Sequence, residues 1–75
     1  MVKVVKSEKV GQKFTEARSK LNLSLEDISK NILINIKYLE AIEKDDYSIF
    51  PARAFALAYY KKYSKFLEIK DIFPL

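Results

Sequence analysis

Side chains that commonly perform catalysis are scarce in this sequence of 75 residues. It contains no histidine and no cysteine, so it lacks the groups most used for proton transfer near neutral pH, thiolate chemistry and zinc binding. Its carboxylates lie at surface-type positions, at helix caps or in acidic runs, and so small a domain has little room for a cleft between paired acids. One glycine excludes a glycine-rich phosphate loop. We therefore expect a binding module and not an enzyme, with no cofactor, metal or small-molecule substrate.

Aromatic residues at helical spacing are the side chains best suited to binding. At 100° per residue, with Phe55 at 0°, Phe66 falls at about 20° and Tyr59 at about 40°, with Lys62 beside them at about 340°. Other large side chains fall between about 80° and 140°, namely Tyr63, Leu67 and Tyr60. The apolar arc is wider than the ~100° stripe that a helix usually buries. If the core is centred on the second group, the first group forms a partner-binding face at its edge. The residues alone equally allow that all the aromatic side chains belong to the core.

Helices must position these residues, because apolar side chains recur at helical spacing and one glycine is too few for the turns of a β-rich fold. The predicted helices span 8–21, 25–31, 36–44, 51 or 52 to 67, and, weakly, 70–73. The pattern indicates an all-α fold, a compact bundle of about five short helices. We expect a single domain over 1–75, with a core of 7–69 and a basic N-terminal arm of 1–6.

Capping residues set the expected helix starts. Ser7 precedes the first helix, Ser24 and Asp27 resemble a capping box before the second, and Asn35 precedes the third. Pro51 suits the first position of the fourth helix, where its missing N–H costs nothing. The apolar stretch 32–34 predicts a tight, buried turn. Two further sets are expected to face the core: Val10, Phe14, Ala17 and Leu21 of the first helix, and Phe50 of the last connection.

The second and third predicted helices resemble the helix-turn-helix of phage-repressor-type domains, which implies a lambda-repressor-like arrangement. Crossed helices of this kind are locked by apolar residues, here Ile28, Ile32, Ile34, Leu39 and Ile42. Glu43 stands where these domains usually carry a Glu at the end of the recognition helix. That helix would present Asn35, Lys37 and Tyr38 to DNA, and these are the candidate DNA-binding residues of an alternative function.

The distribution of charge disfavours that alternative. The formal net charge is +4, but residues 24–50 carry three basic and six acidic side chains, while 1–23 carry six basic and two acidic and 51–75 carry five basic and two acidic. The segment expected to meet DNA is thus acidic, whereas DNA affinity depends mainly on neutralised phosphates. The basic N-terminal lysines are either a solvated surface or a weak contact for an anionic partner, the inner membrane surface or DNA. These lysines are Lys3, Lys6, Lys9 and Lys13.

A more specific resemblance covers about residues 10–69. The chain resembles the cytoplasmic domain of the RodZ family of bacterial cell-shape factors. The matching residues are Gly11, Ala17-Arg18, Leu23-Ser24-Leu25-Glu26, Tyr38 to Glu43, Asp46-Tyr47, Pro51, and Phe55, Tyr59, Tyr63 and Leu67 at four-residue steps. The resemblance implies a cytoplasmic location at the inner membrane, a following basic linker and transmembrane helix, and binding to the actin-like filament protein MreB. It would make this chain an excised fragment of a longer membrane-anchored protein.

The resemblance also assigns a site. The partner-contacting aromatics of the family lie early in the fourth helix and match Phe55 and Tyr59, which favours the binding face over the all-core alternative. The sequence departs from the family nearby, because Ala58 replaces the usual glycine and Leu57 the usual basic residue. We therefore expect a protein-interaction module that binds an MreB-like protein through Phe55, Tyr59, Phe66 and Lys62. A DNA-binding regulator is the alternative.

Overall fold

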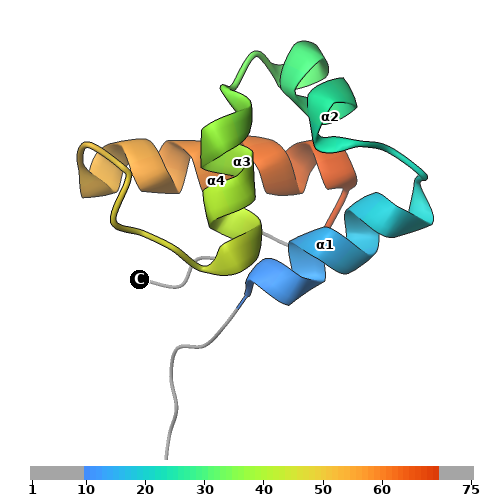
Figure 1. The fold of residues 1–75 in the computed structure, drawn as a ribbon, viewed down its shortest axis with the longest axis horizontal. Helices are drawn as coiled ribbons and strands as arrows, with labels where there is room; N and C mark the ends of the chain where they lie inside the picture. Colours follow the sequence, from blue (N-terminus) through green and yellow to red (C-terminus); the bar gives the residue numbers. More distant parts are fainter. Residues whose placement is uncertain (1–9, 70–75) are drawn as a thin grey trace, which may run out of the picture.

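The computed structural model describes residues 10–69 and shows an all-helical fold in which this part of the chain contains no β-strand. Residues 10–69 contain four of the five predicted helices: α1 (Gly11–Lys20), α2 (Leu25–Ile32), α3 (Ile36–Lys44) and α4 (Arg53–Leu67). Figure 1 shows α2 and α3 as the crossed pair of a helix-turn-helix. The predicted helix at 70–73, the cap at Ser7, the helical residues before Val10 and the arm of 1–6 lie outside the described residues.

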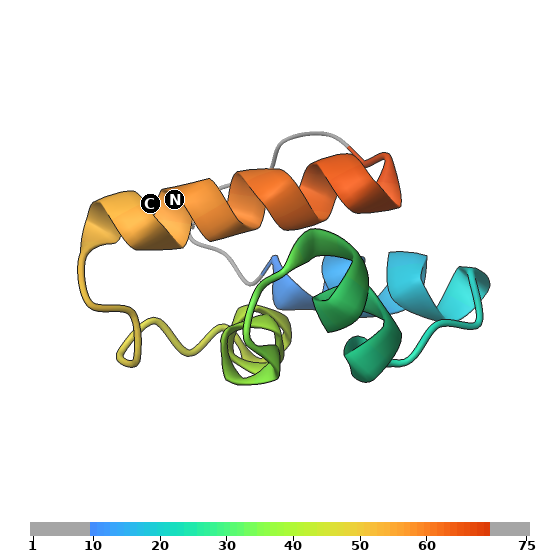
Figure 2. The same ribbon diagram turned by 90° about the horizontal axis from the view of Figure 1, so that it is seen from above.

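The helices form two layers with the core between them. Figure 2 shows α4 lying along one side of the layer made by α1, α2 and α3. Each helix of that layer contributes fully buried side chains to the core, and α4 contributes Tyr60 and Tyr63 from the other side. The buried cluster consists of Val10, Phe14, Ile28, Ile32, Ile34, Leu39, Ile42, Tyr60, Tyr63 and Leu67. The long, aromatic helix α4 therefore covers the core-facing side of the helix-turn-helix.

Local capping starts α2 and α3 where the sequence predicts. The amide of Asp27 donates to Ser24 Oγ at 3.1 Å and the amide of Ser24 donates to Asp27 Oδ2 at 3.0 Å, which confirms the capping box. These hydrogen bonds hold the pKa of Asp27 below its ordinary value. Asn35 Oδ1 accepts from the amide of Lys37 at 2.9 Å. The bounds of α3 are as predicted, and α2 is one residue longer.

Two apolar residues expected inside are exposed. Leu33 is 84% exposed although its neighbours Ile32 and Ile34 are buried. It ends α2 in the left-handed conformation (φ 59°), so the chain reverses there and the side chain points away from the core. Leu21 is 51% exposed, because α1 ends at Lys20 and Leu21 already lies in the following turn.

The fourth helix begins two residues later than Pro51 would predict. Ala52 is extended (φ −158°, ψ 158°) and stands at the N-cap, so Arg53 is the first helical residue. A residue before proline disfavours the helical region, so α4 does not extend back to Phe50, which lies half-buried against the core. The late start lets the connection turn this ring toward α3 and α4.

Candidate partner-binding surface

Four aromatic rings from three segments meet where α3, the connection to α4 and the first half of α4 lie together. Tyr38 of α3 lies 5.0 Å from Tyr59 and 5.4 Å from Phe50, measured between ring centroids. Tyr59 also lies 6.0 Å from Phe50 and 6.4 Å from Phe55. These spacings are typical of attractive aromatic pairs. We call Tyr38, Phe50, Phe55 and Tyr59 the aromatic surface.

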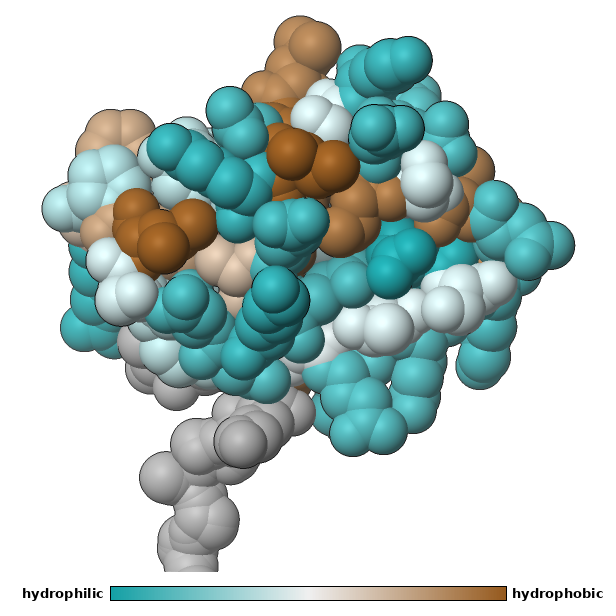
Figure 3. Space-filling view, in the orientation of Figure 1, coloured by the Kyte–Doolittle hydropathy of each residue, from teal (hydrophilic) through white to brown (hydrophobic). Residues whose placement is uncertain are grey.

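The four rings differ in exposure. Phe55 is 50% exposed, while Tyr38, Phe50 and Tyr59 are half-buried. Tyr60, Tyr63 and Leu67 are buried, which confirms that the core-facing side of this helix is centred on them. In Figure 3, brown apolar patches lie among polar side chains both over the connection from α3 to α4 and over the junction of α2 with α3. The aromatic surface is thus anchored inward and open outward at Phe55.

A largely apolar hollow adjoins this surface. It is lined by Tyr47, Phe50, Ala52, Arg53 and Ala56. Phe50 belongs both to the hollow and to the aromatic surface, so the two are continuous. An apolar hollow beside an exposed ring is the arrangement in which a partner's side chain can be desolvated.

The structure brings together only part of the predicted partner-binding set. Phe55 and Tyr59 are adjacent, and Lys62 is exposed two-thirds of the way along α4. Phe66 is half-buried and packs against the core, and its position eleven residues after Phe55 places it about 16 Å further along the helix. Tyr38 and Phe50 were missing from the predicted set because no spacing within α4 could indicate rings supplied by other elements.

Most of the candidate DNA-binding residues make contacts with other residues of the protein. Asn35 uses its side-chain oxygen to cap α3, and Tyr38 packs against Phe50 and Tyr59. Lys37 is exposed, with its Nζ 5.2 Å from the centre of the Tyr38 ring. Base readout needs free donors and acceptors at the start of the recognition helix, and here that position offers few.

The acidic character of the helix-turn-helix is weaker on the surface than in the sequence. Two of its six carboxylates face α1: Glu43 binds Arg18 and Asp45 accepts from the amide of Gly11 at 2.9 Å. Both are partly buried. The exposed acidic residues are Glu26, Asp27, Glu40 and Asp46. The same segment also exposes three lysines, Lys30, Lys37 and Lys44, so charge alone opposes DNA binding less than expected.

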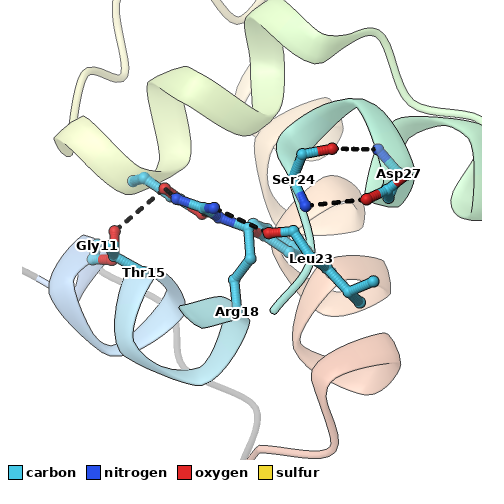
Figure 4. Close-up of polar contacts among 8 residues, drawn as sticks. Gly11, Thr15, Arg18, Leu23, Ser24 and Asp27 are labelled. Carbon is cyan, nitrogen blue, oxygen red and sulfur yellow. Dashed lines mark hydrogen bonds and ion pairs between the residues drawn. The ribbon is translucent and has the colours of Figure 1, made fainter. Parts of the chain in front are cut away.

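A polar cluster joins α1, α3 and α4 on the opposite side of α3. Glu43 accepts from Arg18 Nε at 2.8 Å, from Arg18 Nη2 at 2.9 Å and from Thr15 Oγ1 at 3.1 Å. The Tyr63 hydroxyl donates to the same carboxylate, and Arg18 Nη1 reaches the carbonyl of Leu23 at 3.0 Å. Figure 4 shows Arg18 extending from α1 toward α3, with Thr15 alongside. The cluster thus links α1, α3 and α4 through one carboxylate.

The protonation behaviour of this cluster follows its contacts. Burial by itself would raise the pKa of Glu43, but hydrogen bonds from Arg18, Tyr63 and Thr15 outweigh it and hold that pKa below its ordinary value. The Glu43 hydrogen bond raises the pKa of Arg18. Burial, together with the neighbouring carboxylate, raises the pKa of Tyr63. The arrangement is a charged pair with every oxygen used, which suits a structural role.

Gly11 explains how closely α1 approaches α3. A Cβ atom placed there would lie 2.3 Å from the carbonyl oxygen of Glu43 and 2.6 Å from that of Ile42. Both atoms are backbone, so they cannot move aside cheaply. The sequence marked Gly11 only through a family resemblance, because the atoms it contacts are more than 30 residues away along the chain.

Two other kinds of feature are absent from residues 10–69. This part of the chain holds no group of three His, Cys, Asp or Glu side chains placed to bind a metal ion. None of its helices is long and apolar enough to cross a membrane.

Comparisons with known proteins agree with this fold. The family described as "Helix-turn-helix domain" matches residues 13–72. The chain is 30% identical to the cytoskeleton protein RodZ of Streptococcus pneumoniae over 67 residues, which are 89% of this chain and 24% of that protein. It is 37% identical to an uncharacterized protein of Haemophilus influenzae over 62 residues, which are 81% of this chain and 20% of that protein.

The chain thus spans about a fifth to a quarter of the length of these relatives. No solved structure matches the chain. The family match covers all four helices except the first two residues of α1. The chain belongs to the helix-turn-helix domain family that is found at the N-terminus of RodZ proteins.

Proposed function

We propose that this chain is a protein-interaction module of a bacterial cell-shape factor and that it binds an MreB-like actin homologue through the aromatic surface. The observation that carries the proposal is Phe55, which is 50% exposed at the edge of a ring cluster whose other members are half-buried. An exposed aromatic ring on a supported base is typical of an interface anchor. The similarity to a cytoskeleton protein supports a filament as the partner.

The packing of the surface supports a preformed site. Tyr59 is held between Tyr38 and Phe55, so its ring is ordered before any partner arrives. Ordering side chains on binding costs about 0.5–1.5 kcal/mol each, and a preordered ring avoids that cost. Lys62 lies one turn beyond Tyr59 on α4, and in this proposal it contacts the edge of the partner. Phe66 serves the core and borders the site.

In this proposal the chain is the cytoplasmic part of a longer protein anchored in the inner membrane, and it forms one domain with its core at 7–69. The chain's share of its relatives, between 20% and 24% of their length, supports this. The domain then links the filament to the membrane, and a basic arm at 1–6 adds weak attraction to anionic lipid.

Phe55→Ala tests the proposal directly. We expect the variant to stay folded, because the ring is half exposed, and to bind the purified MreB-like protein of the same organism at least tenfold more weakly, as truncation of an anchor residue does. Leu21→Ala is the matched control, since Leu21 is a large apolar residue of nearly equal exposure (51%) in the turn that follows α1. Co-sedimentation with filaments and circular dichroism are the measurements. Equal binding by folded Phe55→Ala and Tyr59→Ala variants would overturn the proposal.

The helix-turn-helix itself favours DNA binding as a second candidate, with Lys37 as the exposed basic residue at the start of α3. A fluorescence titration with mixed duplex DNA at several salt concentrations tests it. A regulator holds its selected sites about 10³-fold or more above non-specific DNA. Binding without any preferred sequence, and abolished by moderate salt, would exclude this candidate.

A further inference from the structure

The outward face of α4 carries two kinds of exposed side chain in separate halves. In the first half, Ala54 and Ala58 are exposed one turn apart, beside Phe55. In the second half, three lysines are exposed within five residues, Lys61, Lys62 and Lys65. At 100° per residue these six side chains occupy one arc of about 120°, from Lys61 to Phe55. We call these six residues the outer α4 face.

The acidic residue nearest to these lysines in the sequence is the exposed Glu68, which stands at the C-cap of α4 and not on the helix itself. The sequence of α4, RAFALAYYKKYSKFL, contains no Asp or Glu. Within residues 10–69 the ion pair that forms is between Arg18 and Glu43, on the far side of α3. The three lysines form no ion pair within residues 10–69, so they present positive charge along the second half of α4.

The two halves make different demands on a partner. Two alanines one turn apart leave the helix backbone uncovered by large side chains. Another helix can therefore pack closely there, more easily than a loop that carries large side chains. Phe55 supplies an apolar anchor at the same end. Three clustered ammonium groups attract carboxylates at the other end. A helix that is apolar at one end and acidic at the other satisfies both.

From this pattern we propose that the partner element recognised by the outer α4 face is an acidic amphipathic α-helix of the filament protein. It crosses α4 at Ala54 and Ala58, and it brings carboxylates to Lys61, Lys62 and Lys65. The inference rests on the proposed function and names the chemistry of the same site. Attraction between the lysines and these carboxylates speeds association, while burial of Phe55 slows dissociation of the complex.

A lipid surface fits the same face less well. A helix that binds in the membrane interface inserts a broad apolar side, but the apolar side of α4 is buried in the core through Tyr60, Tyr63 and Leu67. Phe55 alone is a large exposed apolar residue on this helix. Alanines contribute little to insertion, whereas they matter for helix packing. We therefore assign the face to a protein helix.

A charge-neutralised triple variant tests the acidic part of the inference. Lys61→Gln/Lys62→Gln/Lys65→Gln should weaken binding to the purified MreB-like protein about tenfold at low salt and remove most of its salt dependence. The matched control is Lys13→Gln/Lys20→Gln/Lys30→Gln, in which three exposed lysines of other helices are replaced. Both triples change the formal net charge from +4 to the same lower value. Equal weakening by the two triples would overturn the inference, because the effect would then be one of net charge.

A bulky substitution tests the helix-packing part. Ala58→Leu should weaken binding about tenfold or more, because the added side chain holds the two helices apart. Ser19→Leu places the same side chain on an exposed position of α1 and should leave binding unchanged. Carbodiimide cross-linking of the wild-type complex, followed by mass spectrometry, should join Lys62 to a carboxylate within a helix of the partner. A cross-link to a loop, or full binding by Ala58→Leu, would overturn the inference.

The outcomes separate this inference from the proposed function. If Phe55→Ala loses binding while the α4 triple and Ala58→Leu bind normally, the filament partner stands and its acidic helix does not. If the wild-type domain does not bind the filament protein, both fail. If the α4 triple loses binding only to phosphatidylglycerol vesicles, the face is a lipid contact and the inference is wrong.

Discussion

The two sides of α3 show how one helix can serve stability and recognition with different chemistry. Toward α1 it presents Glu43, whose carboxylate is saturated by Arg18, Tyr63 and Thr15. Toward α4 it presents Tyr38, which stacks in a ring cluster that ends in an exposed phenylalanine. The first contact is polar, closed and complete. The second is aromatic and open, and only an open contact can accept a partner without breaking internal hydrogen bonds.

The comparison predicts that changes on the polar side affect folding and changes on the aromatic side affect binding. The following variants test that division through the free energy of unfolding at pH 7, measured by urea denaturation, and run from the largest expected effect to the smallest.

Gly11→Ala should have the largest effect, because its Cβ would lie 2.3 Å from a backbone oxygen of α3. We expect a loss of about 3 kcal/mol, at the upper end of the cost of overpacking a rigid site. Gln12→Ala, at the next and exposed position, should change stability by less than about 0.5 kcal/mol. A Gly11→Ala variant as stable as the wild type would show that α1 does not approach α3 so closely.

Arg18→Met should cost about 2–3 kcal/mol, since it leaves the partly buried Glu43 carboxylate without its cation. Glu43 has a lowered pKa in the folded state, so its stabilising contribution is present above its ordinary pKa of 4.5 and is lost as the pH falls through the lower folded value. The difference between wild type and variant should therefore shrink below about pH 4.5. A constant difference down to pH 2 would contradict this account, and Lys20→Met is the control for loss of an exposed cation.

Tyr59→Ala should cost about 1–2 kcal/mol, because a half-buried ring between Tyr38 and Phe55 loses its packing. It should also lose partner binding, so it belongs to both sides of the comparison. Tyr59→Phe keeps the ring and should retain both stability and most of the binding. If the two variants were equally destabilised, the hydroxyl and not the ring would be the stabilising group.

Phe55→Ala should have the smallest effect on stability, within about 0.5 kcal/mol, because half of the ring is in solvent. The contrast with Gly11→Ala separates folding from binding. Phe55→Ala should fold normally and lose binding, while the folded fraction of Gly11→Ala should bind normally. A marked loss of stability in Phe55→Ala would mean that the ring belongs to the core.

The sequence predicted the parts of this fold that are determined locally. Ser24 and Asn35 cap α2 and α3 through atoms within three residues, so the starts of both helices were predictable. The helical periodicity also grouped Tyr60, Tyr63 and Leu67 on one side of α4, and the structure buries that side. Both signals lie inside single elements.

The contacts between elements could not be predicted in the same way. Leucine rarely adopts the left-handed conformation, so the residue type of Leu33 does not indicate the turn that exposes its side chain. The meeting of Tyr38 with Tyr59 depends on how α3 crosses α4, and the cluster at Glu43 depends on how α1 crosses α3. Of the candidate site, the sequence predicted the α4 members and missed the two rings supplied by α3 and the connection.

The capping of α1 has a consequence for the order of folding. Val10 offers this helix no side-chain cap, and the amide of Gly11 finds its acceptor in Asp45, 34 residues later. A helix of ten residues that begins with glycine is only marginally stable alone. We therefore expect α2 and α3 to form first, because each has its own side-chain cap. The helix α1 should become ordered only after α3 has formed and placed Asp45, so the amides of α1 should acquire exchange protection last during refolding.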